Sequence, residues 1–438
     1  MMQRPNHCLD RAGMDAIAAA PALLASELSF EGPGRLDKPK FAKSNVLDLA
    51  LFGGTPVFAQ PRSTSSLVPP DAEAFFAYSK LFFEQRRYTN NGPLVQMLEQ
   101  RLAAFHQVSH CLSFCSGFWA LVLAMKCLAL EGRTEVVMPS LTYRRMADVA
   151  AWVGLTPHFC EVDPITLAMS PATAQACINE NTALILGVHP IVNCCDAQGL
   201  VEMAQRRGIP LLFDSVESMY ETRSGRKVGS IGVAECFSMH ASKLINGFEG
   251  GYVTTSDPKL AHRLEVMRGF GFYGQDNIEE LGTNAKLNEV HAAMTLAALD
   301  GLEIQVIRNR ARYEYYKDLL HAIPELRLVP FDETERCSFK NILVELEDDW
   351  PLARAELIAL LNAEGILARA YYSPPLHRKK ASYRTIGTDL PVTDRLSERF
   401  ILLPCGHFVD DADTDAIGKT LRFARKHARQ IHERASRG

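Results

Sequence analysis

One lysine of this sequence stands where its amine could act as a nucleophile. Lys243 follows an apolar run at residues 236–239 and precedes residues 246–251 (NGFEGG), which hold three glycines. A lysine is normally a solvated surface charge, but burial in such a setting lowers its pKa and makes it nucleophilic. Asp214 comes earlier, directly after the apolar run 210–213. A carboxylate at the carboxyl end of a parallel strand faces the ligand crevice, although an aspartate there also caps helices.

A possible anion site lies further upstream. Residues 116–120 (SGFWA) join the apolar run 111–115 to a helical pattern at residues 119–131. The first N–H groups of a helix have no partner inside it, so they can hold a phosphate, and Gly117 lets the backbone approach closely. Taken alone, the same pattern also describes an ordinary turn between a strand and a helix.

The three features together fit one cofactor, pyridoxal phosphate. This cofactor needs a cradle for its phosphate, a lysine amine for the Schiff base, and a carboxylate that keeps its pyridine nitrogen protonated. The turn with Gly117, then Asp214, then Lys243 supply these groups in chain order. Each lies at the end of a predicted strand, so one edge of a sheet can bring them together.

An alternation of strands and helices must position these residues. The strand candidates are residues 111–115, 135–138, 182–186, 210–213, 236–239 and 251–255. Continuous apolar strands separated by helical patterns are typical of βαβ units. The predicted fold class is therefore α/β, with a mixed, mostly parallel sheet flanked by helices.

The chain divides into three predicted regions. Residues 1–50 are poorly patterned and form an N-terminal extension, and residues 51–305 form the large cofactor-binding domain. A long periodic helical stretch at residues 289–320 leaves this domain. Residues 306–438 then form a smaller C-terminal α/β domain, with a strand predicted at residues 341–347.

Composition excludes several classes of protein. Of the 438 residues, 47% are hydrophobic and 22% are charged, as in ordinary globular proteins. The net charge of −4 argues against a nucleic-acid partner. No apolar run reaches the roughly 20 residues that span a bilayer, so no membrane association is expected. Residues 14–28 contain Asp15, Pro21 and Glu27 and indicate an N-terminal helix or arm rather than a signal peptide.

The 11 cysteines are odd in number and scattered through apolar contexts. This usage is typical of a reducing compartment, and we expect a cytoplasmic protein. Cys194 and Cys195 are adjacent, and no second pair follows at zinc-finger spacing. No metal site is therefore expected.

Several segments match a known family. In chain order they are residues 53–56, 89–93, 116–117, 139–143, 237–251, 282–289 and 391–393. Through them the sequence resembles the DegT-type sugar aminotransferases, a family of fold-type I in the aspartate aminotransferase superfamily. So many ordered matches, spread over roughly residues 51–425, are far more specific than one glycine motif.

The resemblance implies roles for three residues at the cofactor ring. Lys243 matches the lysine that forms the Schiff base, and Asp214 matches the partner of the pyridine nitrogen. Tyr143 matches the aromatic side chain that stacks on the face of the ring.

The resemblance also implies a set of phosphate ligands. Ser238 matches a hydroxyl that binds the cofactor phosphate beside the backbone N–H groups of Gly117 and Phe118. Asn284 matches a phosphate ligand that reaches in from the other subunit. A homodimer with shared active sites follows from that match.

On the substrate side, Tyr371, Tyr372 and His377 match a segment of the small domain that lines the site. The resemblance implies an enzyme that converts a keto-sugar, carried on a phosphate or a nucleotide, into an amino sugar for amino-sugar or antibiotic biosynthesis. Glutamate is the expected amino donor, and pyridoxamine phosphate is the intermediate form of the cofactor. The long N-terminal extension resembles the branch that acts on 3-oxo-glucose 6-phosphate.

The sequence departs from the family pattern at three places. Phe118 replaces a threonine, Phe248 replaces a glycine, and Glu217 stands where Gln or His lies near the phenolic oxygen of the cofactor. We expect Glu217 to be held protonated, because a neutral carboxylic acid can donate the hydrogen bond of Gln or His. The alternative is that Glu217 turns away and pairs with a cation such as Arg144 or Arg145.

Two rival functions use the same fold. A pyridoxamine-phosphate-dependent sugar dehydratase would carry histidine in place of Lys243. A non-catalytic binding protein would not need Lys243, Asp214 and Ser238 together. A nicotinamide dehydrogenase is disfavoured because no G-x-G-x-x-G motif follows an early strand. Transamination is therefore the predicted activity.

Overall fold

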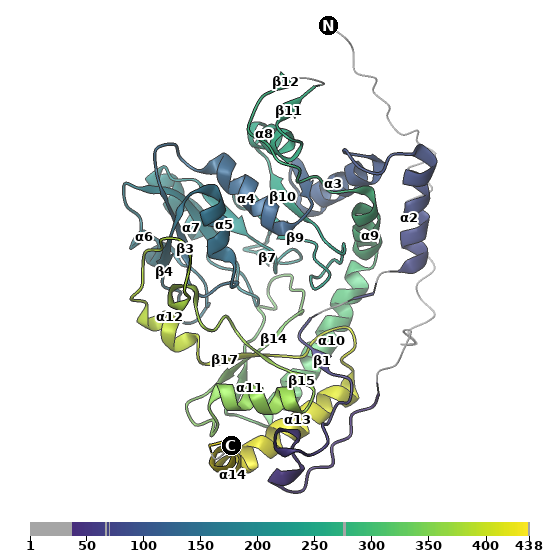
Figure 1. The fold of residues 1–438 in the computed structure, drawn as a ribbon, viewed down its shortest axis with the longest axis vertical. Coiled ribbons are helices and arrows are strands. Elements are labelled where there is room, and N and C mark those ends of the chain that lie inside the picture. Colours follow the sequence, from purple (N-terminus) through teal and green to yellow (C-terminus); the bar gives the residue numbers. More distant parts are fainter. Residues whose placement is uncertain (1–36, 66–67, 70, 275–276, 437–438) are drawn as a thin grey trace. The chain divides into compact units, whose positions relative to one another are not determined.

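The apolar runs of the sequence form a seven-stranded sheet in the computed structural model, which describes residues 37–65, 68–69, 71–274 and 277–436 (Figure 1). The helix or arm expected at residues 14–28 lies outside the described residues. The strands of the sheet are β2 (His110–Phe114), β3 (Glu135–Pro139), β4 (Thr156–Cys160), β5 (Thr182–Val188), β6 (Leu211–Asp214), β9 (Ala234–Ser238) and β10 (Gly251–Thr255).

The strand order is β2-β10-β9-β6-β5-β3-β4. β10 runs antiparallel to both of its neighbours, while the pairs β9–β6, β6–β5, β5–β3 and β3–β4 are parallel. The expected mixed, mostly parallel α/β sheet is thus confirmed. The edge strand β4 was not predicted, because its TPHFC sequence contains Pro157 and His158 and lacks a continuous apolar run.

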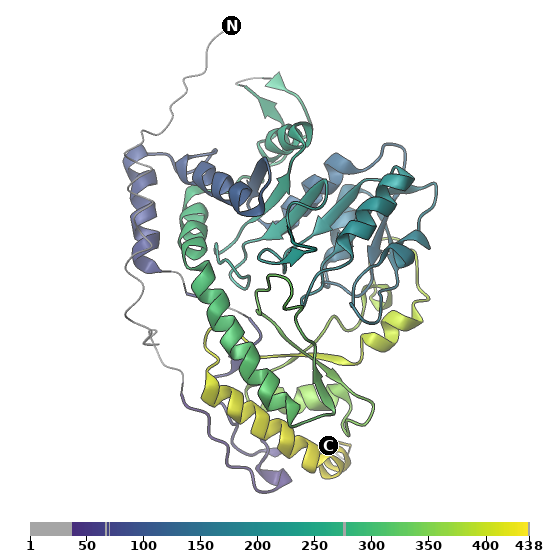
Figure 2. The same cartoon turned by 180° about the vertical axis from the view of Figure 1, so that it is seen from behind.

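Helices cover both faces of this sheet, as alternate side chains of each strand require. In β3, Val136 and Met138 pack in one apolar core, and Val137 packs in the other. The first core contains residues of α4 (Gly117–Leu128), α5 (Met146–Val153) and α8 (Pro258–Arg268). The second contains residues of α3 (Pro93–His106), α7 (Ala197–Arg207) and α9 (Glu289–Asp300). α2 (Ala72–Gln85) lies beside α9 (Figure 2).

The helical stretch expected at residues 289–320 is divided into two helices. α9 ends at Asp300, and α10 (Leu302–His321) begins after Gly301 with its axis turned by 58°. Glycine is the poorest helix former after proline, so a bend at Gly301 costs little. α9 therefore packs in the second core, on one face of the seven-stranded sheet, whereas Tyr313 and Tyr316 of α10 belong to the C-terminal core.

The C-terminal core surrounds a second sheet with the strand order β13-β14-β17-β16, in which every pair is antiparallel. Its strands are β13 (Leu326–Leu328), β14 (Ile342–Leu346), β17 (Phe400–Leu403) and β16 (Arg369–Ala370). α11 (Arg354–Ala363) and α13 (Asp411–Lys426) contribute to the same core, and α12 (Pro391–Leu396) and α14 (Ala428–Ala435) complete the region. The domain limits expected at residues 305 and 306 stay a prediction.

The chain before α2 packs onto this C-terminal core. Val46 and Leu49 lie in it, in the short turns η2 (Val46–Asp48) and η3 (Ala50–Phe52). Glu364 is fully buried and accepts hydrogen bonds from the backbone N–H groups of Ala50 (2.7 Å) and Val57 (2.9 Å). Lys43 pairs with the same carboxylate at 2.9 Å. This buried contact attaches a segment that the sequence patterning left unassigned.

The remaining elements are short. They are β1 (Arg62–Ser63) with β15 (Ile366–Leu367), β7 (Thr222–Arg223) with β8 (Arg226–Lys227), β11 (Phe272–Tyr273) with β12 (Asn277–Ile278), α6 (Pro171–Gln175) and η4 (Leu376–Arg378). Among the described residues, no single helix is long and apolar enough to cross a bilayer. Only α9 and α10 taken together, a pair bent by 58°, have the length and composition of a span.

Candidate active site

The three features predicted to bind the cofactor meet at one edge of the seven-stranded sheet. Asp214 is the last residue of β6, and Ser238 is the last residue of β9. Gly117 begins α4 directly after β2, and Tyr143 follows β3. Because β2, β9, β6 and β3 point the same way, their carboxyl ends share an edge, which is where open α/β sheets bind ligands.

The N-terminus of α4 forms a tight cradle against β9 and β10. The side chain of Ser116 caps the helix by accepting a hydrogen bond from the N–H group of Trp119 at 3.2 Å. A Cβ atom on Gly117 would lie 3.0 Å from Cβ of Ser238, and one on Gly251 would lie 2.4 Å from the nitrogen of Gly117. Glycine is therefore required at position 251, and any larger residue at position 117 would crowd Ser238. The free N–H groups of this first turn and the Ser238 hydroxyl are suited to a phosphate.

Asp214 is a buried carboxyl, only 2% exposed. Burial raises its pKa to about 7, and the N–H group of Val216, 3.1 Å from Oδ1, and the charge of Lys243 only partly oppose that rise. No ion pair to Asp214 is present among the described residues. A protonated pyridine nitrogen would give this carboxylate a cationic partner, so Asp214 fits the cofactor.

Polar atoms without partners gather at the same strand ends. Within the described part of the chain, Thr142 Oγ1, Ser218 Oγ and His189 Nε2 are buried without a hydrogen-bond partner. The His189 ring stacks on Phe213 with centroids 5.3 Å apart, and its backbone N–H group donates to the carbonyl of Asp214 at 3.1 Å. Buried polar atoms normally have partners, so these atoms indicate a ligand site.

His189 was missed by the sequence reasoning. The only available signal was a histidine just after the strand predicted at residues 182–186, and that signal is weak without the packing. In the structure β5 extends to Val188 and places His189 next to Asp214.

Lys243 and Glu217 form an ion pair inside the site, and a second lysine completes it. Lys243 Nζ contacts Oε1 of Glu217, while Lys340 Nζ lies 2.7 Å from Oε2. Burial alone would raise the pKa of Glu217, but the two ammonium groups lower it to about 2. Burial alone would lower the pKa of Lys243, but the Glu217 carboxylate raises it above its ordinary value.

These contacts differ from two expectations. In the chain without cofactor, two ammonium groups lower the pKa of Glu217, where a raised pKa was expected, and its cations are Lys243 and Lys340 in place of Arg144 or Arg145. The pKa of Lys243 is raised and not lowered, because a directly bonded anion outweighs desolvation. Lys340 was not predicted, since nothing in its local sequence sets it apart from a surface lysine.

Tyr143 and Tyr372 lie close enough to the reacting groups to influence them. The Tyr143 side chain is half-exposed, and it is an electrostatic neighbour of Lys243. Tyr371 and Tyr372 follow β16, and their rings pack at an interplanar angle of 40° with centroids 4.3 Å apart. Burial raises the pKa of Tyr372, and Glu217, Asp214 and Tyr143 also act on it. The structure thus brings these tyrosines to the site, while their roles stay predictions.

His377 is held by two contacts behind this surface. Its Nδ1 atom lies 2.7 Å from the hydroxyl of Ser140, and its Nε2 atom lies 3.0 Å from Asp394. These contacts join η4 to the loop after β3, which also contains Tyr143. The predicted contact of His377 with substrate stays a prediction. Asn284 is exposed and pairs only through its backbone, in an isolated bridge with Gly269.

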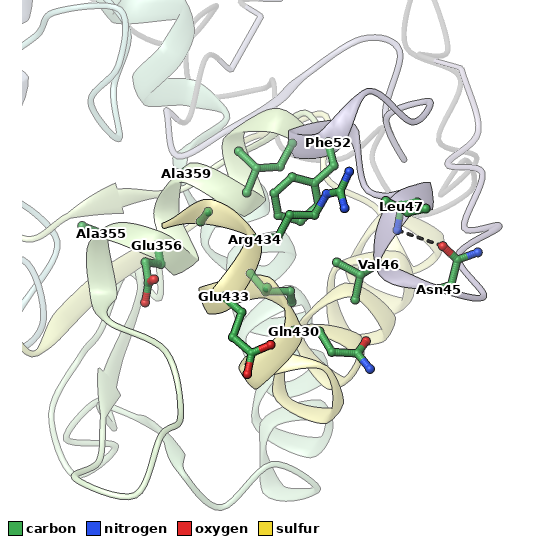
Figure 3. Close-up of a pocket in the computed structure, with 13 residues that line it drawn as sticks. Asn45, Val46, Leu47, Phe52, Ala355, Glu356, Ala359, Gln430, Glu433 and Arg434 are labelled. Carbon is green, nitrogen blue, oxygen red and sulfur yellow. Dashed lines mark hydrogen bonds between the residues drawn. The ribbon is translucent and has the colours of Figure 1, made fainter. Parts of the chain in front are cut away.

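A separate cavity of about 1040 Å³ lies between the η2–η3 segment, α11 and α14 (Figure 3). It is lined by apolar side chains and by Glu356, Glu433 and Arg434, whose guanidinium lies 5.5 Å from the Phe52 ring centroid. None of the residues predicted for chemistry lines it. Among the described residues, no group of three or more His, Cys, Asp and Glu side chains is arranged to hold a metal ion.

A phosphate cradle, a buried carboxylate and a lysine amine at one edge of a mostly parallel sheet define a pyridoxal-phosphate-dependent transferase. A family profile, DegT/DnrJ/EryC1/StrS aminotransferase family, matches residues 71–422, so the chain belongs to this family. It is an aminotransferase, and its cofactor is pyridoxal phosphate. The resemblance, the fold class and the cofactor expected from the sequence are confirmed.

The relatives are sugar-processing proteins. The dTDP-4-amino-4,6-dideoxy-D-glucose transaminase of Shigella dysenteriae is 28% identical over 81% of this chain and 96% of its own length. The UDP-N-acetyl-3-dehydro-alpha-D-glucosamine 3-aminotransferase of Acidithiobacillus ferrooxidans is 30% identical over 70% of this chain and 82% of its own length. The solved structure of DesI with its TDP-sugar product is 32% identical, with a TM-score of 0.84, and covers 90% of this chain and all of its own.

Proposed function

We propose that this protein transfers an amino group to a keto-sugar and that Lys243 and Asp214 carry out the reaction. The single observation that supports this most is the meeting of Lys243, Asp214 and the α4 N-terminus at one sheet edge. When bound, pyridoxal phosphate supplies the aldehyde that captures an amine and the ring that withdraws electrons from the substrate carbon.

Most of the site residues hold the cofactor, and Lys243 transfers the proton. Asp214 keeps the ring nitrogen protonated, and Tyr143 stacks on the ring. The N–H groups of Gly117 and Phe118 and the hydroxyl of Ser238 hold the phosphate. The Lys243 amine would take the proton from the α-carbon of the amino donor and deliver it to the former aldehyde carbon of the cofactor, as general base and then general acid.

The acceptor is proposed to be a keto-sugar that carries phosphate. The printed names of the two curated relatives above both describe nucleotide-linked sugars. In this chain Arg144 and Arg145 directly follow Tyr143. Burial lowers the pKa of Lys379, and the charges of both arginines lower it further, which places the three cations near one another. Such a cluster suits the phosphate of a sugar phosphate or of a nucleotide sugar.

Glutamate is the proposed amino donor. A relative from Micromonospora echinospora, 29% identical over 81% of this chain, is named L-glutamine:2-deoxy-scyllo-inosose aminotransferase. Glutamine is therefore the second donor to assay. The cytoplasm is the proposed location, because all ten cysteines of the described residues are free thiols, as in a reducing compartment.

The protein is proposed to act as a homodimer with shared sites. Two groups of large apolar side chains are exposed on the single chain. One lies on α2 and just after it, and consists of Phe76, Phe83 and Tyr88; the other precedes Asn284 in the sequence and consists of Phe270, Phe272, Tyr273, Ile278 and Leu281. Exposed apolar side chains in such number are typical of an interface. A second copy would cover them and place Asn284 at the phosphate of the neighbouring site.

The test combines a covalent trap with a substrate panel. The cofactor-loaded protein is reduced with borohydride, and the labelled peptide is expected to contain Lys243. Glutamate and a panel of keto-sugar phosphates and nucleotide-linked keto-sugars should give an amino sugar. Lys243→Ala should lose both results, while Lys259→Ala, a change at an exposed lysine of α8, should keep them. Full turnover by Lys243→Ala would overturn the assignment.

A sugar dehydratase remains the second candidate on this fold. The panel separates the two activities, since transamination adds nitrogen to the sugar and dehydration removes its oxygen without adding nitrogen. Lys243 supports transamination, because a lysine amine can return to the cofactor after each turnover.

A further inference from the structure

Glu217 is shared by two lysines that come from different parts of the chain. Lys243 lies between β9 and β10, and Lys340 lies just before β14. The Lys340 side chain is 6% exposed and its Nζ atom is 2.7 Å from Oε2 of Glu217, which also accepts from Lys243 through Oε1. The carboxylate therefore bridges the nucleophile to a second, permanently placed cation.

The reaction makes that second cation useful. To move a proton, Lys243 must alternate between its ammonium form and its neutral form. Without Lys340, Glu217 would be a buried carboxylate without a counter-ion each time Lys243 becomes neutral, a state that is strongly unfavourable. Lys340 remains at Oε2 throughout and stabilises the carboxylate in that state.

We propose that Lys340 is a positioning residue of amino transfer, which stays paired with the Glu217 carboxylate when Lys243 is neutral and thereby lets Lys243 release its proton at a lower pH. This proposal rests on the proposed role of Lys243 as the residue linked to the cofactor. Lys340 touches neither substrate nor the reacting atoms in this account, and it acts through Glu217.

Other titratable groups face the pair from the elements packed against it. They are Asp214 at the end of β6, Tyr143 after β3, Tyr371 and Tyr372 after β16, and Cys405 after β17. A substitution at residue 340 leaves all of them in place. Differences between variants at this position therefore report on the Lys340 charge.

The test is a spectroscopic pH titration of the cofactor-loaded protein, which follows protonation of the Lys243 nitrogen through the visible absorption. In Lys340→Met, loss of the cation should move the midpoint to higher pH, because neutral Lys243 then leaves Glu217 unpaired. In Glu217→Gln, loss of the anion should move it to lower pH. At a dielectric constant of about 20–40 and a separation of about 5 Å between the two ammonium groups, the shift in Lys340→Met is about 1.2–2.4 pH units. The shift in Glu217→Gln should be at least as large, because Glu217 contacts Lys243 directly.

Two further variants separate the charge from a merely structural contact. Lys340→Arg keeps the charge and should restore the wild-type midpoint. The double variant Glu217→Gln/Lys340→Met removes both charges, which avoids an unpaired buried ion. Adding Lys340→Met to Glu217→Gln should raise the titration midpoint by less than adding Lys340→Met to the wild type does. The acidic limb of the pH profile of kcat, in which Lys243 must lose its proton to act as a base, should follow the same order.

The outcomes are distinct from those that would refute the proposed function. Lys259→Met is the matched control and should titrate as the wild type does. An unchanged midpoint in Lys340→Met, or an equal shift with and without Glu217, would overturn the role of Lys340 alone. Cofactor fixed by borohydride to a residue other than Lys243 would instead remove the assignment of Lys243.

Discussion

Replacing Asp214 by asparagine should raise the free energy of unfolding of the cofactor-free protein and lower the turnover of the enzyme. In the cofactor-free chain the Asp214 carboxyl is 2% exposed, and burial raises its pKa from an ordinary value of 3.8 to about 7. Asparagine has nearly the same shape, can still accept from the N–H group of Val216, and carries no charge to desolvate.

The sign and size follow from proton linkage. Below pH 3.8 both the folded and the unfolded chain hold the proton, so Asp214 costs nothing. Between pH 3.8 and about pH 7 only the folded chain holds the Asp214 proton, so the free energy of unfolding falls as pH rises. At about 1.36 kcal/mol per pH unit, the loss between pH 5 and pH 8 is about 3 kcal/mol. Asp214→Asn should lack this loss.

The assay is chemical denaturation of the cofactor-free protein at pH 5 and pH 8. We expect the stability of Asp214→Asn relative to wild type to increase by about 3 kcal/mol between these values. Glu265→Gln, at an exposed position of α8, is the control for loss of a carboxylate. In the presence of saturating pyridoxal phosphate the advantage should shrink or reverse, and turnover should fall sharply. A relative stability that is the same at both pH values would refute the reasoning.

Three further predictions concern the shared site, the cradle and the N-terminal attachment. Mixed Lys243→Ala and Asn284→Ala chains should regain activity as hybrid dimers, since one of the two sites is then intact; inactive hybrids of proven composition would argue against a role for Asn284 in the partner's site. Gly117→Ala should weaken cofactor binding by about 1–3 kcal/mol, measured by fluorescence titration, because the new Cβ crowds Ser238; Gly301→Ala, where a Cβ meets only one atom at 3.9 Å, is the control. Glu364→Ala should lower the free energy of unfolding by about 3–5 kcal/mol, since Lys43 is left buried and unpaired; a loss no larger than that of Glu398→Ala, an exposed site, in urea denaturation would contradict this.

The central sheet and the ends of its strands could be predicted because the relevant signals are local. β3, β5, β6 and β10 are buried throughout, so each appears in the sequence as a continuous apolar run. A polar residue directly after such a run lies at a strand end, whatever the rest of the chain does. Asp214 and Ser238 could be located for this reason, and Lys243 by the glycines that follow it.

Features that depend on contacts between distant segments could not be predicted. Lys340 meets Glu217 only because β14 packs near the loop after β6, and the charge states of Glu217 and Lys243 follow from that contact. Gly301 lies inside a periodic helical pattern, and the turn of 58° at this residue is set by two different cores. Residues 38–58 lack a helical or strand period because their order comes from the C-terminal core.

The buried contact of Lys43 with Glu364 has a consequence for the newly made chain. Val46 and Leu49 belong to a core that also contains Ile431, so an early segment of the chain waits for a residue that is made much later. At a synthesis rate of about 5–20 residues per second, this wait is about 20–80 s. During that time the core is incomplete, and its apolar side chains are exposed to chaperones and proteases. Assembly of the C-terminal core therefore needs both the η2–η3 segment and α14, and loss of either should leave this core open.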